Sequence, residues 1–338
     1  MQPMSHLPRQ DPLAEDKNQS LGTEGMSSTE FTLGMLFISQ TTVGVLGNFS
    51  LLYHHITLYF TGCRLRSTDS ILTHLTVANF LVILSKGIPQ TLAALGWKDF
   101  LNDFGCKFIF YLHRVGRGVT MGSTCLLSVF QAITISPRNS RWAKLKLKAP
   151  KYISPSNILF WVLHMLVNIL VLFSLTGNRD KKSSKKRGDS GYCSFVFNDI
   201  TTCLLHVALF SFPDVVCLGL MTWASGSMVF ILYRHKQQVQ HIHRNNISAR
   251  SSPESRATQS ILVLVSTFVS FYTVSYILSI CLILFYPSWW MVNTATLTSA
   301  CFPTISPFVL LSHDSRVSKN CHVCTEKKTQ FCHLIKNI

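Results

Sequence analysis

Seven apolar stretches dominate this 338-residue chain, and each is long enough to cross a lipid bilayer. A membrane-spanning helix needs about 20 mostly apolar residues. The stretches lie near residues 32–60, 69–95, 106–135, 155–175, 200–233, 257–285 and 288–311. Prolines interrupt the fifth and the seventh, which membrane helices tolerate when neighbouring groups satisfy the freed backbone. The pattern predicts an all-α membrane protein, a seven-transmembrane helix bundle, and disfavours a large soluble helical protein.

The charged residues are few, and most lie between the apolar stretches. They make up 14% of the chain against 47% hydrophobic residues, whereas soluble domains carry about 25% charged residues. A net charge of +16 would suggest nucleic-acid binding in a soluble protein. Here the basic residues lie in loops beside apolar helices, which is the pattern that orients membrane proteins. We therefore expect the lipid bilayer as a partner, no nucleic acid, and a multi-pass protein of the plasma membrane.

The distribution of Lys and Arg predicts the orientation. With the N-terminus outside, the cytoplasmic segments carry twice as many Lys and Arg residues as the extracellular segments, although a basic loop at 179–187 works against this bias. The loop predicted at 136–153 is strongly basic and holds no acid. Positive charge favours the cytoplasmic side. We therefore predict an extracellular tail at 1–30, a seven-helix domain at 31–312 and a cytoplasmic tail at 313–338.

Two cysteines stand apart from the others by their position. Cys106 begins the third span at its outer end, and Cys193 lies in the long outer loop before the fifth. Because the outside of a cell is oxidising, we predict a disulfide between them that ties the loop over the mouth of the bundle. Free thiols are the alternative. The other cysteines within spans are interpreted as small apolar fillers.

The two tails carry weaker signals. Asn18 begins the one sequon predicted to lie outside, Asn18-Gln19-Ser20, so we predict glycosylation there. Residues 1–30 hold no signal-peptide run, and Met26 is an alternative start. Cys321 and Cys324 superficially suggest zinc ligands, but palmitoylation or an unmodified tail is the better interpretation. We expect no metal and no cofactor.

Four sequence blocks carry a family resemblance. They are TCLLSVFQAITISP at 124–137 followed by SRWA at 140–143, LTVANF at 75–80, FPD at 212–214 and FPTISPF at 302–308. Over about residues 27–315 the chain resembles the vomeronasal type-1 receptors. The resemblance implies a G-protein-coupled chemosensory receptor that binds a pheromone-like small molecule within the bundle, activates a heterotrimeric G protein of the Gi/Go type, and is no enzyme.

Alternatives to this interpretation are a bitter-taste-type chemoreceptor and a seven-helix transporter. The third-helix block argues against the first, and a transporter would be expected to show internal repeats, which the sequence lacks. Asn79 stands where the rhodopsin-like class usually places an Asp, and no Asp-Arg-Tyr occurs at the inner end of the third span. Such replacements are normal for vomeronasal receptors, so they do not argue against a working receptor.

Charged residues at membrane depth are costly and usually face the bundle interior. Those that qualify are Lys86, Arg114, Arg117 and Asp214. Counted from the outer ends of their helices at about 1.5 Å per residue, Lys86, Arg117 and Asp214 lie roughly 13, 16 and 21 Å deep. Their depths therefore overlap. The helical spacing also places His113 and Arg114 on a face with Arg117.

Two interpretations of these residues remain open, and both can hold. Arg117 and Asp214 can form a structural ion pair that allows both to be buried. Alternatively, His113, Arg117 and Lys86 line a ligand cavity. Three cations against one acid leave surplus positive charge, so we hypothesise that the cavity tolerates or prefers an acidic group, such as a sulfated or carboxylated small molecule.

Two further sets of polar residues carry expectations. His164 and Asn168 are four residues apart on the fourth span, and hydrogen bonding between helices is favoured over ligand contact for this pair. On the cytoplasmic side, the 136–153 loop and the basic end of the fifth span, with Arg234 and Lys236, are expected to meet the G protein.

Overall fold

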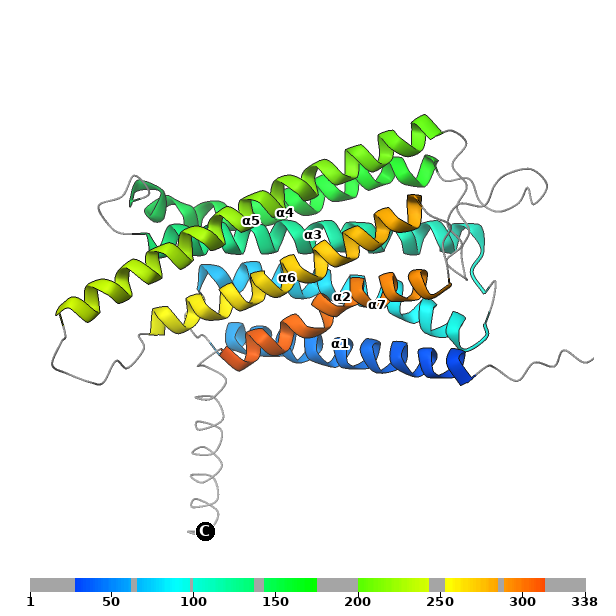
Figure 1. Ribbon diagram of the computed structural model, residues 1–338, viewed down its shortest axis with the longest axis horizontal. Coiled ribbons are helices and arrows are strands. Elements are labelled where there is room, and N and C mark those ends of the chain that lie inside the picture. The colour runs from blue at the N-terminus through cyan, green and yellow to red at the C-terminus, as the bar shows by residue number, and fades with distance from the viewer. Residues whose placement is uncertain are drawn as a thin grey trace, which may run out of the picture.

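The computed structural model describes residues 28–61, 66–97, 100–136, 143–174, 200–242, 253–284 and 289–313. These residues form seven helices: α1 Ser28–Phe60, α2 Ser67–Ala94, α3 Asp103–Ile135, α4 Ala143–Ser174, α5 Ile200–Ile242, α6 Pro253–Leu284 and α7 Trp289–His313. Each contains a segment long and apolar enough to cross a membrane. The predicted all-α bundle of seven spans is confirmed (Figure 1).

The predicted helix boundaries agree with the structure except around α4 and the end of α5. α4 begins at Ala143, well before the predicted start near residue 155, and α5 continues to Ile242. Much of the loop predicted at 136–153 is therefore helical, including its last four lysines. The prediction was wrong there because it placed the helix start at the end of the apolar run. Lys and Leu are good helix formers, so a helix can continue beyond the bilayer.

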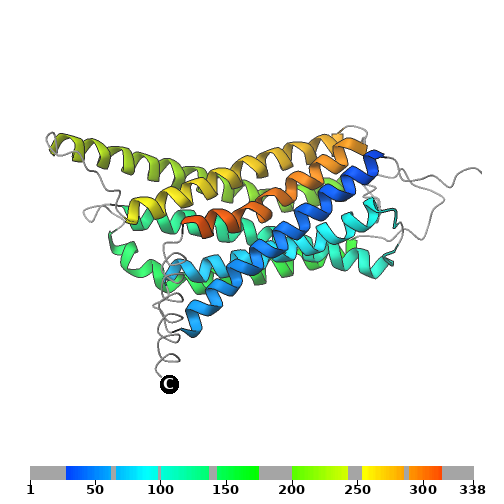
Figure 2. The ribbon, with the colours of Figure 1, turned by 90° about the horizontal axis from the view of Figure 1, so that it is seen from below.

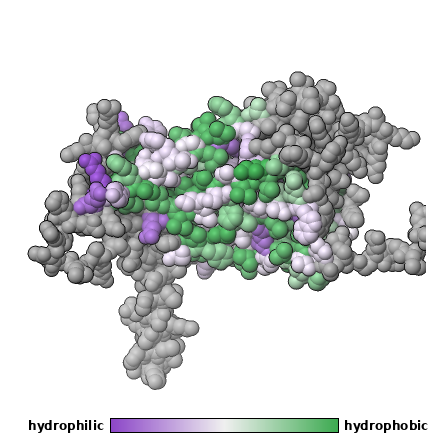
Figure 3. Space-filling view, in the orientation of Figure 1, coloured by the Kyte–Doolittle hydropathy of each residue, from purple (hydrophilic) through white to green (hydrophobic). Residues whose placement is uncertain are grey.

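α3 runs through the middle of the bundle and contacts α2, α4, α5 and α6 (Figures 1 and 2). It has the largest share of buried residues among the spans, whereas α4 and α5 have the smallest. Gly118 and Gly122 let α4 approach closely, since a Cβ on Gly122 would lie 2.7 Å from the Phe160 ring. Hydrophobic side chains cover much of the outer face (Figure 3), as a surface in contact with lipid tails requires.

A buried polar cluster ties four helices together near the centre. The Asn79 amide of α2 donates to the Ser306 hydroxyl of α7 at 2.9 Å, and its oxygen accepts from Thr120 of α3 at 3.1 Å. Asn48 of α1 donates to the Pro303 carbonyl at 2.9 Å. Because these side chains are almost fully buried, each hydrogen bond avoids the cost of an unsatisfied polar group. The cluster fixes the frame on which the candidate site is built.

α3 begins at a capped turn. The Asn102 side chain accepts from the Gly105 backbone N–H at 2.7 Å, which satisfies one of the free donors at the helix start. Cys106, in the first turns of α3, is disulfide-bonded. Its predicted partner, Cys193, lies outside the described residues, as do Asn18, Cys321 and Cys324. The Cys106–Cys193 pairing and the assignments in both tails therefore stay predictions.

Candidate ligand-binding site

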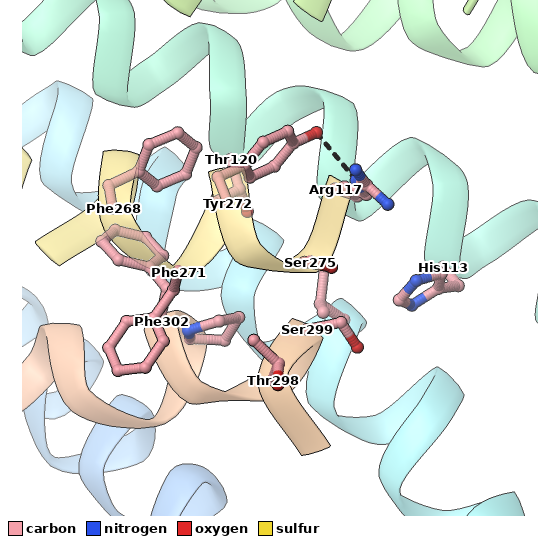
Figure 4. Close-up of a pocket in the computed structure, with 12 residues that line it drawn as sticks. His113, Arg117, Thr120, Phe268, Phe271, Tyr272, Ser275, Thr298, Ser299 and Phe302 are labelled. Atoms are coloured by element: carbon pink, nitrogen blue, oxygen red, sulfur yellow. Dashed lines mark hydrogen bonds between the residues drawn. The ribbon is translucent and has the colours of Figure 1, made fainter. Parts of the chain in front are cut away.

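A small cavity lies within the bundle between α2, α3, α6 and α7 (Figure 4). Its volume is about 30 Å³, which is room for about one or two water molecules. Aromatic and aliphatic groups form one side of it, and hydroxyls with two nitrogen-bearing side chains form the other. The lining residues are Val82, His113, Arg117, Thr120, Phe268, Phe271, Tyr272, Ser275, Thr298, Ser299, Phe302 and Pro303.

Arg117 of α3 is the charged residue of this cavity. Its Nε donates a hydrogen bond to the Tyr272 hydroxyl of α6 at 2.7 Å (Figure 4). The guanidinium carbon also lies 4.5 Å from the centre of the same ring, a geometry in which the cation is attracted to the ring face. Tyr272 thus contacts Arg117 in two ways, through its hydroxyl and through the face of its ring.

Asp214 of α5 joins this arrangement through Tyr272. The Tyr272 hydroxyl donates to Asp214 Oδ2 at 2.9 Å, while it accepts from Arg117. The predicted Arg117–Asp214 interaction therefore takes a bridged form, with a hydroxyl of α6 between the two charges. We call this chain of contacts the Arg117–Tyr272–Asp214 relay.

His113 lies one helical turn from Arg117 on the same face of α3 and also lines the cavity (Figure 4). Its Nδ1 is buried and has no hydrogen-bond partner among the described residues. A buried polar atom without a partner costs about 1–3 kcal/mol. His113 therefore offers an unused hydrogen-bonding position inside the cavity.

Lys86 adjoins the cavity without lining it. Its Nζ donates to the Ser299 hydroxyl at 2.9 Å, and Ser299 is part of the cavity wall. Lys86 itself lines a smaller neighbouring cavity with Gln40 and Thr296. Over the described helices, no carboxylate pairs with this ammonium. Lys86 is therefore a partly buried cation at membrane depth whose hydrogen-bond partner is neutral.

Arg114 lies on a different side of α3. Its Nε donates to the Asn168 side-chain oxygen of α4 at 3.1 Å, and its guanidinium lies 5.9 Å from the Phe110 ring centre. Asn168 in turn donates to the His164 carbonyl at 2.7 Å. These contacts favour the interpretation of His164 and Asn168 as helix-packing residues. Of the candidate residues, the structure brings His113 and Arg117 into the cavity, places Lys86 and Asp214 beside it, and turns Arg114 towards α4.

Aromatic residues complete the cavity and were not predicted from the sequence. The Phe268 ring stacks on Tyr272 with centres 5.0 Å apart and meets Phe302 of α7 edge-on at 4.6 Å. Single aromatic residues in apolar spans are common, so Phe268 and Phe302 gave no signal. Tyr272 could have been noticed, because its hydroxyl lies in the middle of an apolar span and needs a partner there.

The arrangement of the helices defines the class of fold. The crystal structure of squid rhodopsin matches this chain with a TM-score of 0.63 at 16% identity, covering 86% of this chain and 84% of that chain. The chain thus has the seven-helix fold of the rhodopsin-like receptors and is a multi-pass membrane protein.

Sequence comparison identifies the family within this class. The model of the vomeronasal organ pheromone receptor family matches residues 31–323. Human vomeronasal type-1 receptor 2 is 59% identical over 295 residues, which cover 87% of this chain and 75% of that protein. Human vomeronasal type-1 receptor 3 is 57% identical over 312 residues, 92% of this chain and 100% of that protein. The chain belongs to the vomeronasal organ pheromone receptor family. The relatives compared above are vomeronasal type-1 receptors.

This membership confirms the resemblance in the third, second, fifth and seventh spans. It identifies the chain as a G-protein-coupled receptor of pheromone type. The family is one of receptors rather than enzymes, and neither the bitter-taste nor the transporter alternative is favoured.

Proposed function

We propose that this receptor binds a small anionic molecule in the cavity beside Arg117 and signals through a G protein of the Gi/Go type. The observation that carries the proposal is the imbalance of charge around the cavity. Among the described residues, the hydrogen-bond partner of Lys86 is a neutral hydroxyl. Arg117 reaches the carboxylate of Asp214 through the Tyr272 hydroxyl. A cation inside a membrane protein normally pairs with an acid, and a ligand can supply that acid.

His113 adds to the case for a polar ligand group. His113 lines the same cavity as Arg117, and its Nδ1 has no hydrogen-bond partner among the described residues, so we infer that a single sulfate or carboxylate can hydrogen-bond to both side chains. Charge-assisted hydrogen bonds of this kind are about twice as strong as neutral ones. Ser299 lines the same cavity and accepts a hydrogen bond from Lys86, so movement of the Lys86 side chain past this hydroxyl would bring its ammonium to the anion.

The opposite wall supports an apolar body for the ligand. Phe268, Phe271 and Phe302 face the cavity with Val82, and aromatic walls bind compact hydrophobic groups well. Pockets for small ligands usually measure about 300–1,000 Å³, far more than the 30 Å³ found here. Ligand entry therefore requires the surrounding helices to move apart.

The distribution of basic residues supports a proposal for which end of the bundle faces the cytoplasm. The end of α3, the start of α4, the end of α5 and the start of α6 lie at the same end of the bundle (Figure 1). The first turns of α4 carry Lys144, Lys146, Lys148 and Lys151, and exposed Arg234 lies near the end of α5. Positive charge favours the cytoplasm, so we assign this end to the G protein and place the N-terminus outside.

Expression in reporter cells that carry a promiscuous G protein tests the proposal. Volatile compounds, steroids and steroid sulfates would be applied, with an N-terminal epitope stained on intact cells to check delivery and orientation. We expect responses to anionic compounds that Arg117→Ala and Lys86→Ala reduce at least about tenfold, because each removes a charged contact of roughly 1.5–3 kcal/mol.

Arg114→Ala is the matched control, since it removes a cation one turn away that contacts α4. It should leave the response within about threefold of wild type, because its guanidinium is bound to Asn168 of α4 and does not line the cavity. If both cavity variants reach the surface and respond to anions like wild type, the anionic-ligand proposal is wrong.

A further inference from the structure

Tyr272 of the cavity wall connects α6 to two other helices through its hydroxyl. Its hydroxyl contacts Arg117 of α3 and Asp214 of α5, and its ring stacks on Phe268, which packs on Phe302 of α7. The side chain is almost fully buried. A displacement of the Tyr272 side chain therefore alters contacts with α3 and α5 directly, and with α7 through Phe268.

The relay meets α5 at a point where that helix can bend. Pro213 immediately precedes Asp214 within α5, and a proline inside a helix removes a backbone hydrogen bond. α5 also has a much smaller share of buried residues than α3. Within the relay, α3 is thus the more buried partner, and the Tyr272–Asp214 hydrogen bond adds to the direct packing of α5 on α3.

We propose that Tyr272 converts occupancy of the cavity into movement of α5 and α6. In the empty receptor its hydroxyl holds Asp214 to Arg117. An anion that binds Arg117 replaces the Tyr272 hydroxyl as the hydrogen-bond acceptor, so Tyr272 and Asp214 are released from α3. The inference rests on the proposed function in one respect, namely that Arg117 is the residue that receives the anion.

The chemistry of the hydroxyl explains why an anion is the effective trigger. A carboxylate or sulfate accepts a charge-assisted hydrogen bond from Arg117 more strongly than a neutral phenol does. A neutral ligand gains less from displacing Tyr272 and would leave the relay closed. The ring stacked on Phe268 then carries the displacement towards Phe302 and the neighbouring Pro303 of α7, where the missing backbone hydrogen bond permits bending.

The test needs no ligand. Tyr272→Phe keeps the ring but removes the hydroxyl from both hydrogen bonds, and it should raise ligand-independent signalling about fivefold at equal surface level. Fivefold corresponds to about 1 kcal/mol, which is a lower bound because both hydrogen bonds of this hydroxyl involve charged groups. Tyr53→Phe makes the same chemical change on the exposed face of α1 and should leave signalling unchanged.

A second variant separates loss of the relay from misfolding. Tyr272→Phe leaves the Asp214 carboxylate without its described donor, which can impair folding. The double variant Tyr272→Phe with Asp214→Leu removes that isolated charge. It should reach the surface and show the same elevated signalling, because both changes interrupt one relay.

Separation of α5 from α3 can also be measured without a G protein. Cys125 of α3 and Cys217 of α5 pack in the same core as free thiols, and Cys217 follows Asp214 by about one turn. In purified receptor treated with diamide, which oxidises thiols to disulfides, Cys125–Cys217 crosslinking should be slower in Tyr272→Phe than in Tyr53→Phe.

Elevated signalling or slower crosslinking in the Tyr272 variants supports the relay, even if no anion ever activates the wild type. Unchanged signalling together with an unchanged crosslinking rate would overturn it, whatever the ligand proves to be. Because Arg117 belongs to the relay as well as to the proposed anion site, Arg117→Ala does not separate the two proposals, whereas Lys86→Ala, which lies outside the relay, tests the ligand proposal alone.

Discussion

Replacing Lys86 by Met should stabilise the empty receptor while it impairs anion responses. Methionine preserves much of the length and apolar volume of the lysine stem but removes the ammonium. Ser299 loses a donor, yet its own hydroxyl still donates to the Thr296 carbonyl at 2.7 Å, so no buried donor is left unsatisfied. Replacing buried charge with apolar groups is often neutral or stabilising by about 1–4 kcal/mol.

We take the lower end of that range, about 1 kcal/mol, because Lys86 is only partly buried. For domains somewhat smaller than this one, 1 kcal/mol shifts the midpoint of thermal unfolding by about 2–4 °C. The assay is thermal unfolding of purified, ligand-free receptor in detergent, followed by the fluorescence of a thiol-reactive dye. We expect Lys86→Met to raise the midpoint by a few degrees.

The matched control is Lys107→Met on the same receptor. Lys107 forms an i,i+4 ion pair with Asp103 at 3.3 Å, in which the side chains are 25% and 52% exposed. Such pairs contribute about 0.3–0.5 kcal/mol, so this variant should unfold slightly earlier than wild type. A thermal unfolding midpoint several degrees lower for Lys86→Met would refute the reasoning. The ammonium would then stabilise the ligand-free fold, and no acidic ligand would be needed to offset its burial.

Two further predictions concern the frame around the site. Gly118→Ala should lower thermal stability and surface delivery, because the new Cβ would overlap the His164 ring, whereas Gly219→Ala meets no atom within 4 Å and should be neutral or stabilising by up to about 1 kcal/mol. A stable Gly118→Ala receptor would contradict the close α3–α4 packing. Asn79→Ala removes hydrogen bonds to two buried hydroxyls and should cost about 1–3 kcal/mol, measured by the same unfolding assay; an unchanged midpoint would show that the cluster is dispensable.

The seven spans could be predicted because bilayer thickness fixes a minimum apolar length, and the sequence meets that length seven times. Depth along a helix also follows directly from residue number. That is why Arg117, Lys86 and Asp214 were expected at similar depths, with which the contacts of Arg117 and Asp214 to Tyr272 agree, and why His113 was placed with Arg117.

Direction around the helix axis was harder to predict. Arg114 and Arg117 are close enough in sequence to share a face, yet Arg114 contacts Asn168 of α4 while Arg117 contacts Tyr272 of α6. The neighbour that a cation contacts depends on which helices pack beside its own helix. The spacing of residues along the sequence does not give that information. For the same reason the sequence paired Arg117 with Asp214 and missed the hydroxyl of α6 between them.

The early start of α4 was missed for a different reason. Alternating Lys and Leu residues after Ala143 are compatible with a helix and with a loop, because helix propensity is a weak guide by itself. The apolar run marks where a helix can lie in lipid. It does not mark where the helix ends.

Selection of an anion by this cavity can be measured by comparing a sulfated compound with its neutral parent on the same receptor. Wild-type receptor should respond to the sulfate at concentrations at least about tenfold lower than to the parent, a difference of about 1.4 kcal/mol. The double variant Arg117→Ala with Lys86→Met, matched for surface level, should lose that preference. An equal or greater response of the wild type to neutral parents across the compounds that activate it would contradict the claim that this cavity selects an anion.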